Sequence, residues 1–199
     1  MLPQAQLVSS ALLASVVLYG AYSDWRWRRL PNWLTLGGGA LGLLVALIGG
    51  ALQGGLPGAF AGGRDSLFGW LLGFALLFLP FALGGMGAGD VKLLGAVGAI
   101  RGPYFVLVAF IYTAIIGGVA SIILLAYQGR LLPLVRGALG WLWLALRCIV
   151  IYRTLPPLGR LKPPAAAGED GSAGKPHLAS IPYGLAIAAG SLLALALGY

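Results

Sequence analysis

The chain carries few charged side chains for its length. Only 9% of its 199 residues are Asp, Glu, Lys or Arg, whereas 59% are hydrophobic. A soluble domain carries about 25% charged residues. This chain has too little polar surface to cover a soluble core, and the composition therefore predicts an integral membrane protein.

Cysteine is almost missing. Cys148 is the single one, so no disulfide can form within the chain and no Cys-x-x-Cys pair is present to bind zinc. Because Cys148 lies in an apolar run, we interpret it as a small buried hydrophobic residue.

Acidic residues are also scarce, and each one can be interpreted separately. The chain has five of them: Asp24, Asp65, Asp90, Glu169 and Asp170. Glu169 and Asp170 lie in a Pro-, Gly- and Ala-rich stretch and are expected to be solvated loop charges. Asp65 is expected in a polar turn. Asp24 and Asp90 remain, and each lies at the edge of an apolar run.

Long apolar runs, in contrast, are abundant, and most approach the roughly 20 residues that cross the hydrocarbon core as a helix. They cover residues 7–22, 34–52, 67–83, 91–100, 104–127 and 181–197. The sequence therefore predicts an all-α, polytopic membrane protein with about six transmembrane helices. We expect a single membrane-embedded domain over residues 1–199.

The run at 91–100 is too short to cross the membrane alone. At 1.5 Å per residue it covers about 15 Å, half of the hydrocarbon core. Either the run continues past Arg101-Gly102-Pro103, or its start is sunk into the membrane. The second alternative would place Asp90 below the membrane surface.

Basic residues predict the orientation, because cytoplasmic loops carry an excess of Lys and Arg. Three arginines follow the first apolar run: Arg26, Arg28 and Arg29. With that loop in the cytoplasm, both termini lie outside and the segment 128–180 is a cytoplasmic loop. All 13 basic residues except Arg64 and Arg101 then lie inside. The net charge of +8 is therefore a topology signal and requires no nucleic-acid partner.

Residues 131–152 are apolar enough to allow a seventh span. Their arginines and Trp143 recur at helical spacing on one face, which favours a helix lying in the membrane interface. A seventh span would move the C-terminus inside, so the two interpretations predict different topologies.

The stretch GGMGAGD at residues 84–90 surrounds Asp90 with glycine. Asp90 could be a helix N-cap, a position that favours Asp. Capping explains neither the glycines nor Asp24, which at a helix C-terminus opposes the helix dipole. Glycines allow unusual backbone conformations and close approach of another chain, as an extended peptide substrate would require. The residues alone leave open whether Asp90 is a helix cap or part of a functional site.

Two carboxylates held close together have a definite chemistry. They share one proton, because like charges do not both ionise cheaply. The ionised member takes a proton from water and the other protonates the developing oxyanion or leaving amine. This is aspartyl peptide hydrolysis, for which we expect neither a metal nor a cofactor.

Three motifs resemble those of one known family. GAGD at 87–90 resembles the GxGD motif of prepilin peptidases, membrane aspartyl proteases that remove the leader from type IV pilin precursors. Asp24, followed by LPN at 30–32, resembles the first aspartate motif of that family. IPYG at 181–184 resembles a third landmark. The motifs occur in the family's order over most of the chain.

The resemblance implies that Asp24 and Asp90 are the catalytic pair. Lys92 could tune the field around Asp90 or snorkel to the membrane surface. Residues with a supporting role would be Gly87, Gly89, Lys92, Pro31, Asn32, Pro182 and Gly184.

The implied substrate is a prepilin or pseudopilin with a short basic leader, cut at the cytoplasmic face of the bacterial inner membrane. The basic loops suit anionic lipid headgroups better than a basic leader. Bifunctional members of the family add a cytoplasmic region, often with paired cysteines, that is linked to N-methylation. Without such cysteines, this chain resembles the short, peptidase-only branch, similar to those of Flp (tight adherence) pilus systems.

Other classes remain as alternatives. The presenilin type of GxGD protease is disfavoured because residues 182–184 do not resemble its third motif. A non-enzymatic membrane protein, either an ion-coupled transporter or a secretion-apparatus scaffold, could also place an acid at a short helix. Transport predicts inverted repeats, and none is evident in the sequence.

Overall fold

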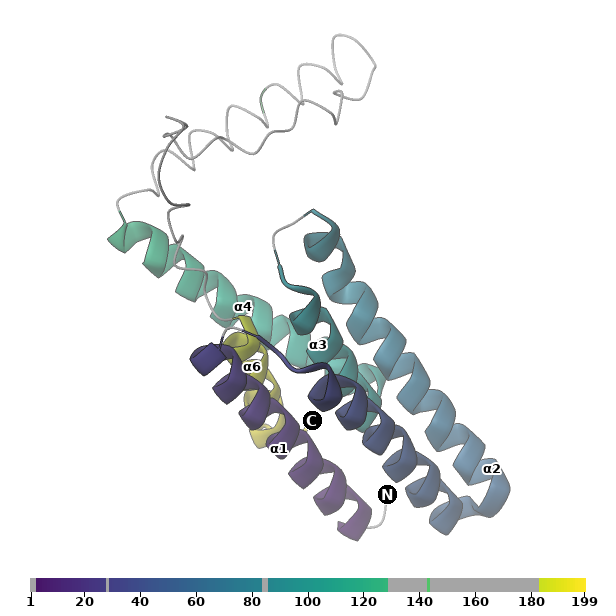
Figure 1. Ribbon diagram of the computed structural model, residues 1–199. Helices are drawn as coiled ribbons and strands as arrows, with labels where there is room; N and C mark the ends of the chain where they lie inside the picture. The colour runs from purple at the N-terminus through teal and green to yellow at the C-terminus, as the bar shows by residue number, and fades with distance from the viewer. Residues whose placement is uncertain (1–2, 28, 84–85, 129–142, 144–182) are drawn as a thin grey trace, which may run out of the picture. The chain divides into compact units, whose positions relative to one another are not determined.

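The computed structural model describes residues 3–27, 29–83, 86–128, 143 and 183–199, and it confirms the all-α class. Every element in this part of the chain is a helix, and none is a strand (Figure 1). The helices are α1 (Pro3–Trp27), α2 (Asn32–Ala82), α3 (Ala88–Arg101), α4 (Pro103–Tyr127) and α6 (Tyr183–Ala196).

The chain divides into two compact units. The first comprises residues 1–118 and 181–199, and the second comprises residues 119–180. All the candidate site residues fall in the first unit. The interfacial helix predicted over 131–152 lies outside the described residues apart from Trp143, and the single domain over 1–199 stays a prediction.

Helix α2 consists of two arms joined at Gly54 and Gly55, where the backbone is not helical. Gly55 has a φ of 60°, which glycine adopts at little cost. The arms run antiparallel, because the backbones of Gly50 and Gly58 are in close contact across the turn. Two residues therefore suffice for the reversal.

This tight turn corrects one expectation. The third apolar run was expected to begin at residue 67, with Asp65 in a polar turn before it, whereas the second arm of α2 is already helical from residue 56. Asp65 therefore lies on an exposed helical surface instead of in a turn, and pairs with Arg64 across 3.5 Å.

Helix α3 forms much of the core. Its residues from Asp90 to Ile100 are buried, with the exception of the half-buried Lys92. It packs against α1, α2 and α6. The contact with α2 is backbone to backbone at Gly69 and Gly98, and the Ser66 hydroxyl donates to the Ala99 carbonyl across 2.6 Å.

The short fourth run does not continue into the next one. α3 ends at Arg101, Gly102 has a φ of 86°, and α4 begins at Pro103. Fourteen residues cover about 21 Å, less than the roughly 30 Å of the hydrocarbon core. The alternative in which the run at 91–100 continues past Arg101-Gly102-Pro103 as one helix is therefore wrong.

Three helices are long and apolar enough to cross a membrane: α1, α2 and α4. Large apolar side chains such as Leu44, Phe68 and Ile111 are exposed on them, as expected for lipid-facing positions. The chain is thus an integral membrane protein by helix length and composition. Six spans, and termini outside, stay predictions.

Candidate active site

Asp24 lies in the last turn of α1, where the chain leaves the helix for α2. The residue is only 9% exposed. Its neighbour Ser23 donates a hydrogen bond to the Arg29 carbonyl across 2.7 Å, which fixes the link between the two helices. The sequence placed Asp24 at the end of the first helix, and the structure confirms that position.

The carboxylate of Asp24 accepts a hydrogen bond from a residue 160 positions away. The Gly184 backbone N–H donates to Asp24 Oδ2 across 2.9 Å in a buried contact. This N–H belongs to the first turn of α6, whose donors have no partner within the helix. A Cβ at residue 184 would lie 2.8 Å from the same oxygen, so only glycine fits without a shift.

Asp90 is the third residue of α3 and is also only 9% exposed. Gly87 takes the N-cap position, so the interpretation of Asp90 as an N-cap is wrong. The Asp90 N–H donates to the Gly87 carbonyl across 3.2 Å. The Asp90 carboxylate therefore lies in the first turn, near the positive end of the helix dipole.

The two aspartates come together in the structure. Helix α1 packs against α3, and the Asp24 carboxylate is close enough to act electrostatically on Asp90. Burial and mutual repulsion both disfavour two negative charges in such a place. Asp24 is thus bonded to α6 through Gly184 and lies within electrostatic range of Asp90 on α3.

The glycines before Asp90 have close neighbours. A Cβ at Gly89 would lie 2.9 Å from Leu30 Cβ, and one at Gly87 would lie 3.4 Å from Asp90 Oδ2. Leu30 precedes Pro31, the N-cap residue of α2. Gly89 therefore leaves room for the link between α1 and α2, whereas a Cβ at Gly87 would meet only the Asp90 carboxylate, at an ordinary van der Waals distance.

Lys92 makes a contact that the sequence did not indicate. Its Nζ donates to Asn32 Oδ1 across 2.9 Å, which ties α3 to the first residue of α2. This bond gives Lys92 and Asn32 a joint structural role. Pro182 lies outside the described residues, so its role stays a prediction.

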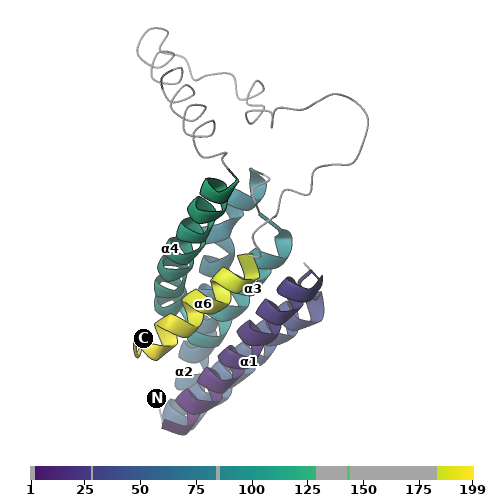
Figure 2. The same cartoon turned by 90° about the vertical axis from the view of Figure 1, so that its left-hand side faces the viewer.

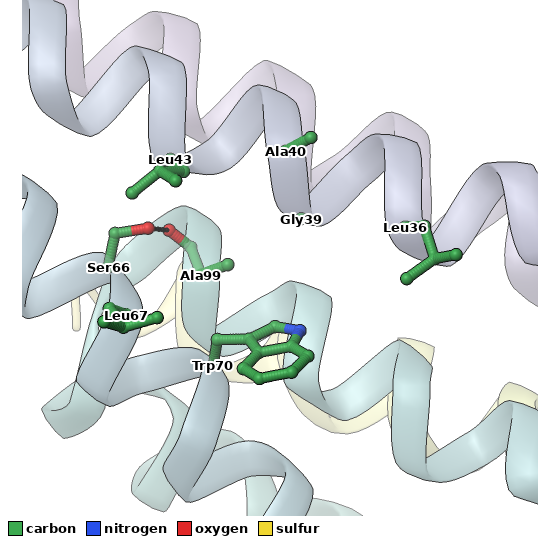
Figure 3. A pocket seen from close by; sticks show the side chains of 8 residues that line it. All are labelled: Leu36, Gly39, Ala40, Leu43, Ser66, Leu67, Trp70 and Ala99. Atoms are coloured by element: carbon green, nitrogen blue, oxygen red, sulfur yellow. Dashed lines mark hydrogen bonds between the residues drawn. The ribbon is translucent and has the colours of Figure 1, made fainter.

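A cavity of about 280 Å³ lies between the two arms of α2 and α3 (Figure 3). Apolar side chains line it, among them Leu36, Leu43 and Trp70, and neither aspartate does. Its one hydroxyl, that of Ser66, is already bonded to Ala99. Among the described residues, no ionisable side chain lines this cavity, and it is separate from the carboxylate pair.

Comparison with known proteins identifies the family of this chain. The model of the type IV leader peptidase family matches residues 11–122. The chain belongs to the type IV leader peptidase family. The match includes Asp24 and Asp90, whereas Gly184 lies beyond it.

A curated relative agrees with the family match. The prepilin leader peptidase/N-methyltransferase of Neisseria gonorrhoeae is 37% identical over 126 residues, which cover 62% of this chain. The chain spans about two fifths of that relative's length, 41%. No solved structure matches the chain significantly.

Proposed function

We propose that this protein is a membrane aspartyl endopeptidase that removes the leader peptide of type IV prepilins or pseudopilins. The observation that supports this proposal most strongly is the pair of buried aspartates, Asp24 and Asp90, which interact although they come from different helices. Family membership supports a peptidase over the transporter and scaffold alternatives.

In the proposed mechanism the carboxylate pair holds one proton, which belongs to the pair and not to either residue. The ionised carboxylate takes a proton from the attacking water as the new C–O bond forms at the scissile carbonyl. The C–N bond then breaks, and the protonated carboxylate supplies the leaving amine with its proton. No other group is required for these steps.

The Gly184 N–H holds Asp24 in place during this cycle. A positioned reacting group contributes to the rate because a displacement of about 1 Å can cost 10²-fold. The bond from Gly184 to Asp24 Oδ2 fixes this oxygen of the carboxylate at the start of α6. α6 is therefore part of the proposed site, through its backbone.

The proposed place of cleavage and the proposed substrate are inferred from the family and from the distribution of Lys and Arg along the chain. Cleavage takes place at the cytoplasmic face of the bacterial inner membrane, which is the side predicted for both aspartates from the distribution of Lys and Arg. The substrate has a short basic leader, a glycine at the cut and an apolar helix. The methyl transfer in the relative's name is outside this proposal, because the alignment covers 41% of that relative.

Purified protein in detergent, mixed with a synthetic prepilin, tests the proposal. Mass spectrometry should show the leader and a mature product with a new N-terminus at the glycine, and a metal chelator should leave the rate unchanged. An intact substrate, or cleavage that stops in the chelator, would contradict the aspartyl mechanism.

A further inference from the structure

A second cavity, of about 460 Å³, lies where α1 ends and α2 begins. Its lining includes Tyr19, Ser23, Arg29, Asn32 and Trp33, whereas Asp24 is not part of it. Because α1 and α2 are both candidate membrane spans, their short connection lies at a membrane–water boundary. The volume falls in the range of about 300–1,000 Å³ that is common for small-molecule sites.

Hydrogen-bond donors without an acid partner line the cavity. Arg29 is exposed, and among the described residues its guanidinium forms no ion pair. Asn32 Oδ1 accepts from Lys92, which directs the amide NH₂ of Asn32 away from that bond. No carboxylate lines the cavity. The polar part of the lining therefore suits an anion, since Arg recognises phosphate through several N–H groups.

Aromatic rings provide much of the apolar part of the lining, which includes Tyr19, Trp27 and Trp33, and Tyr22 packs beside Trp27. The Tyr19 and Trp33 rings lie 5.4 Å apart, and the Tyr22 and Trp27 rings lie 5.6 Å apart in an edge-on contact. Three of these rings, on Tyr22, Trp27 and Trp33, are more than half exposed. Exposed Trp and Tyr at a helix end are typical of the headgroup level of a membrane.

We propose that this cavity binds the headgroup of an anionic phospholipid. The phosphate lies against Arg29 and the Asn32 amide, and the glycerol and upper acyl chain lie against Tyr19 and Trp33. A basic peptide leader is a poor occupant, because Arg29 repels it. The proposal stands independently of peptidase activity.

Native mass spectrometry of the detergent-solubilised protein tests this site, with phosphatidylglycerol and phosphatidylcholine of equal chain length as competing probes. The wild type should retain phosphatidylglycerol preferentially. Arg29→Gln should reduce that preference about fivefold, the effect of one basic residue at an anionic surface. The fold should survive, because Ser23 bonds the backbone carbonyl of Arg29 and not its side chain.

Arg64→Gln is the matched control, since it removes the same charge from an exposed residue that is paired with Asp65. It should leave the lipid preference unchanged. Asn32→Asp should lower the preference as well, because the Lys92 bond is kept while the donating amide becomes a negative oxygen. An equal loss of lipid preference in Arg64→Gln and Arg29→Gln would overturn the proposal. Displacement of the lipid by millimolar glycerol phosphate would also overturn it, because the ligand would then be a free phosphate ester.

Discussion

At the scale of single residues, Gly184 contributes to the candidate site through its backbone and through its lack of a side chain. Its N–H reaches Asp24 only because no Cβ separates the two residues. The sequence indicates Asp24 and Asp90 because acids are so rare in this chain and because their motifs resemble those of a family. It does not reveal that α6 contacts Asp24, since nothing local records a bond across 160 positions.

Gly184→Ala should therefore lower leader cleavage by about 10²-fold while the protein still accumulates in the membrane, because the new Cβ displaces the Asp24 carboxylate. The measurement is the rate of prepilin processing, normalised to membrane-bound protein. Gly37→Ala is the control, since a Cβ there meets nothing within 4 Å. Normal processing by Gly184→Ala would show that this contact has no role in activity.

At the scale of the helices, close backbone contact holds α2 to α3. Gly69 and Gly98 lie so near each other that a Cβ on either would overlap the backbone of the other. Small residues allow such approach between membrane helices, where packing drives association.

Gly69→Ala should destabilise the protein by about 1–3 kcal/mol, the usual cost of overpacking a tight contact. Thermal unfolding in detergent measures the change. Alanine is otherwise the better helix former by about 1 kcal/mol, so Gly37→Ala should be neutral or stabilising. A Gly69→Ala protein as stable as the wild type would mean that α2 and α3 do not pack this closely.

The helices themselves were largely predictable, whereas their boundaries were not. Five apolar runs correspond to described helices or arms because lipid-facing helices need continuous apolar sequence, and the sixth, at 181–197, is helical from Tyr183. The polar turn expected at Asp65 is wrong, because Gly54 and Gly55 complete the reversal of the chain in two residues before it. The charged pair Arg64 and Asp65 suggested a break in the helix, but both side chains are exposed on the helix surface, where charged residues are compatible with a continuous helix.

For the whole molecule, the excess of Lys and Arg predicts that residues 128–180 are cytoplasmic. A cysteine at Ser172, in a Cys148→Ser background, should react only with a membrane-permeant maleimide in intact spheroplasts. Gln53→Cys in the same background, beside the turn of α2, should react with an impermeant reagent. The reverse pattern would invert the topology and move the aspartates to the outer face.

The central claim, that Asp24 and Asp90 act as one proton-sharing pair, is tested most directly by Asp24→Asn and Asp90→Asn in the prepilin cleavage assay. Asn keeps the size, and at residue 24 its Oδ1 can still accept the Gly184 N–H, so the fold should persist. It does not take a proton from water, and loss of general acid–base catalysis costs about 10²–10⁴-fold. A role in helix capping alone would change stability by about 1 kcal/mol or less, since Asn caps about as well as Asp.

Asp65→Asn is the matched control, because Asp65 is an exposed acid in the same unit and should tolerate the change. We expect membrane-inserted Asp24→Asn and Asp90→Asn proteins that each leave prepilin uncut, and an Asp65→Asn protein that processes it at the wild-type rate. Normal processing by either the Asp24→Asn or the Asp90→Asn protein would contradict the account.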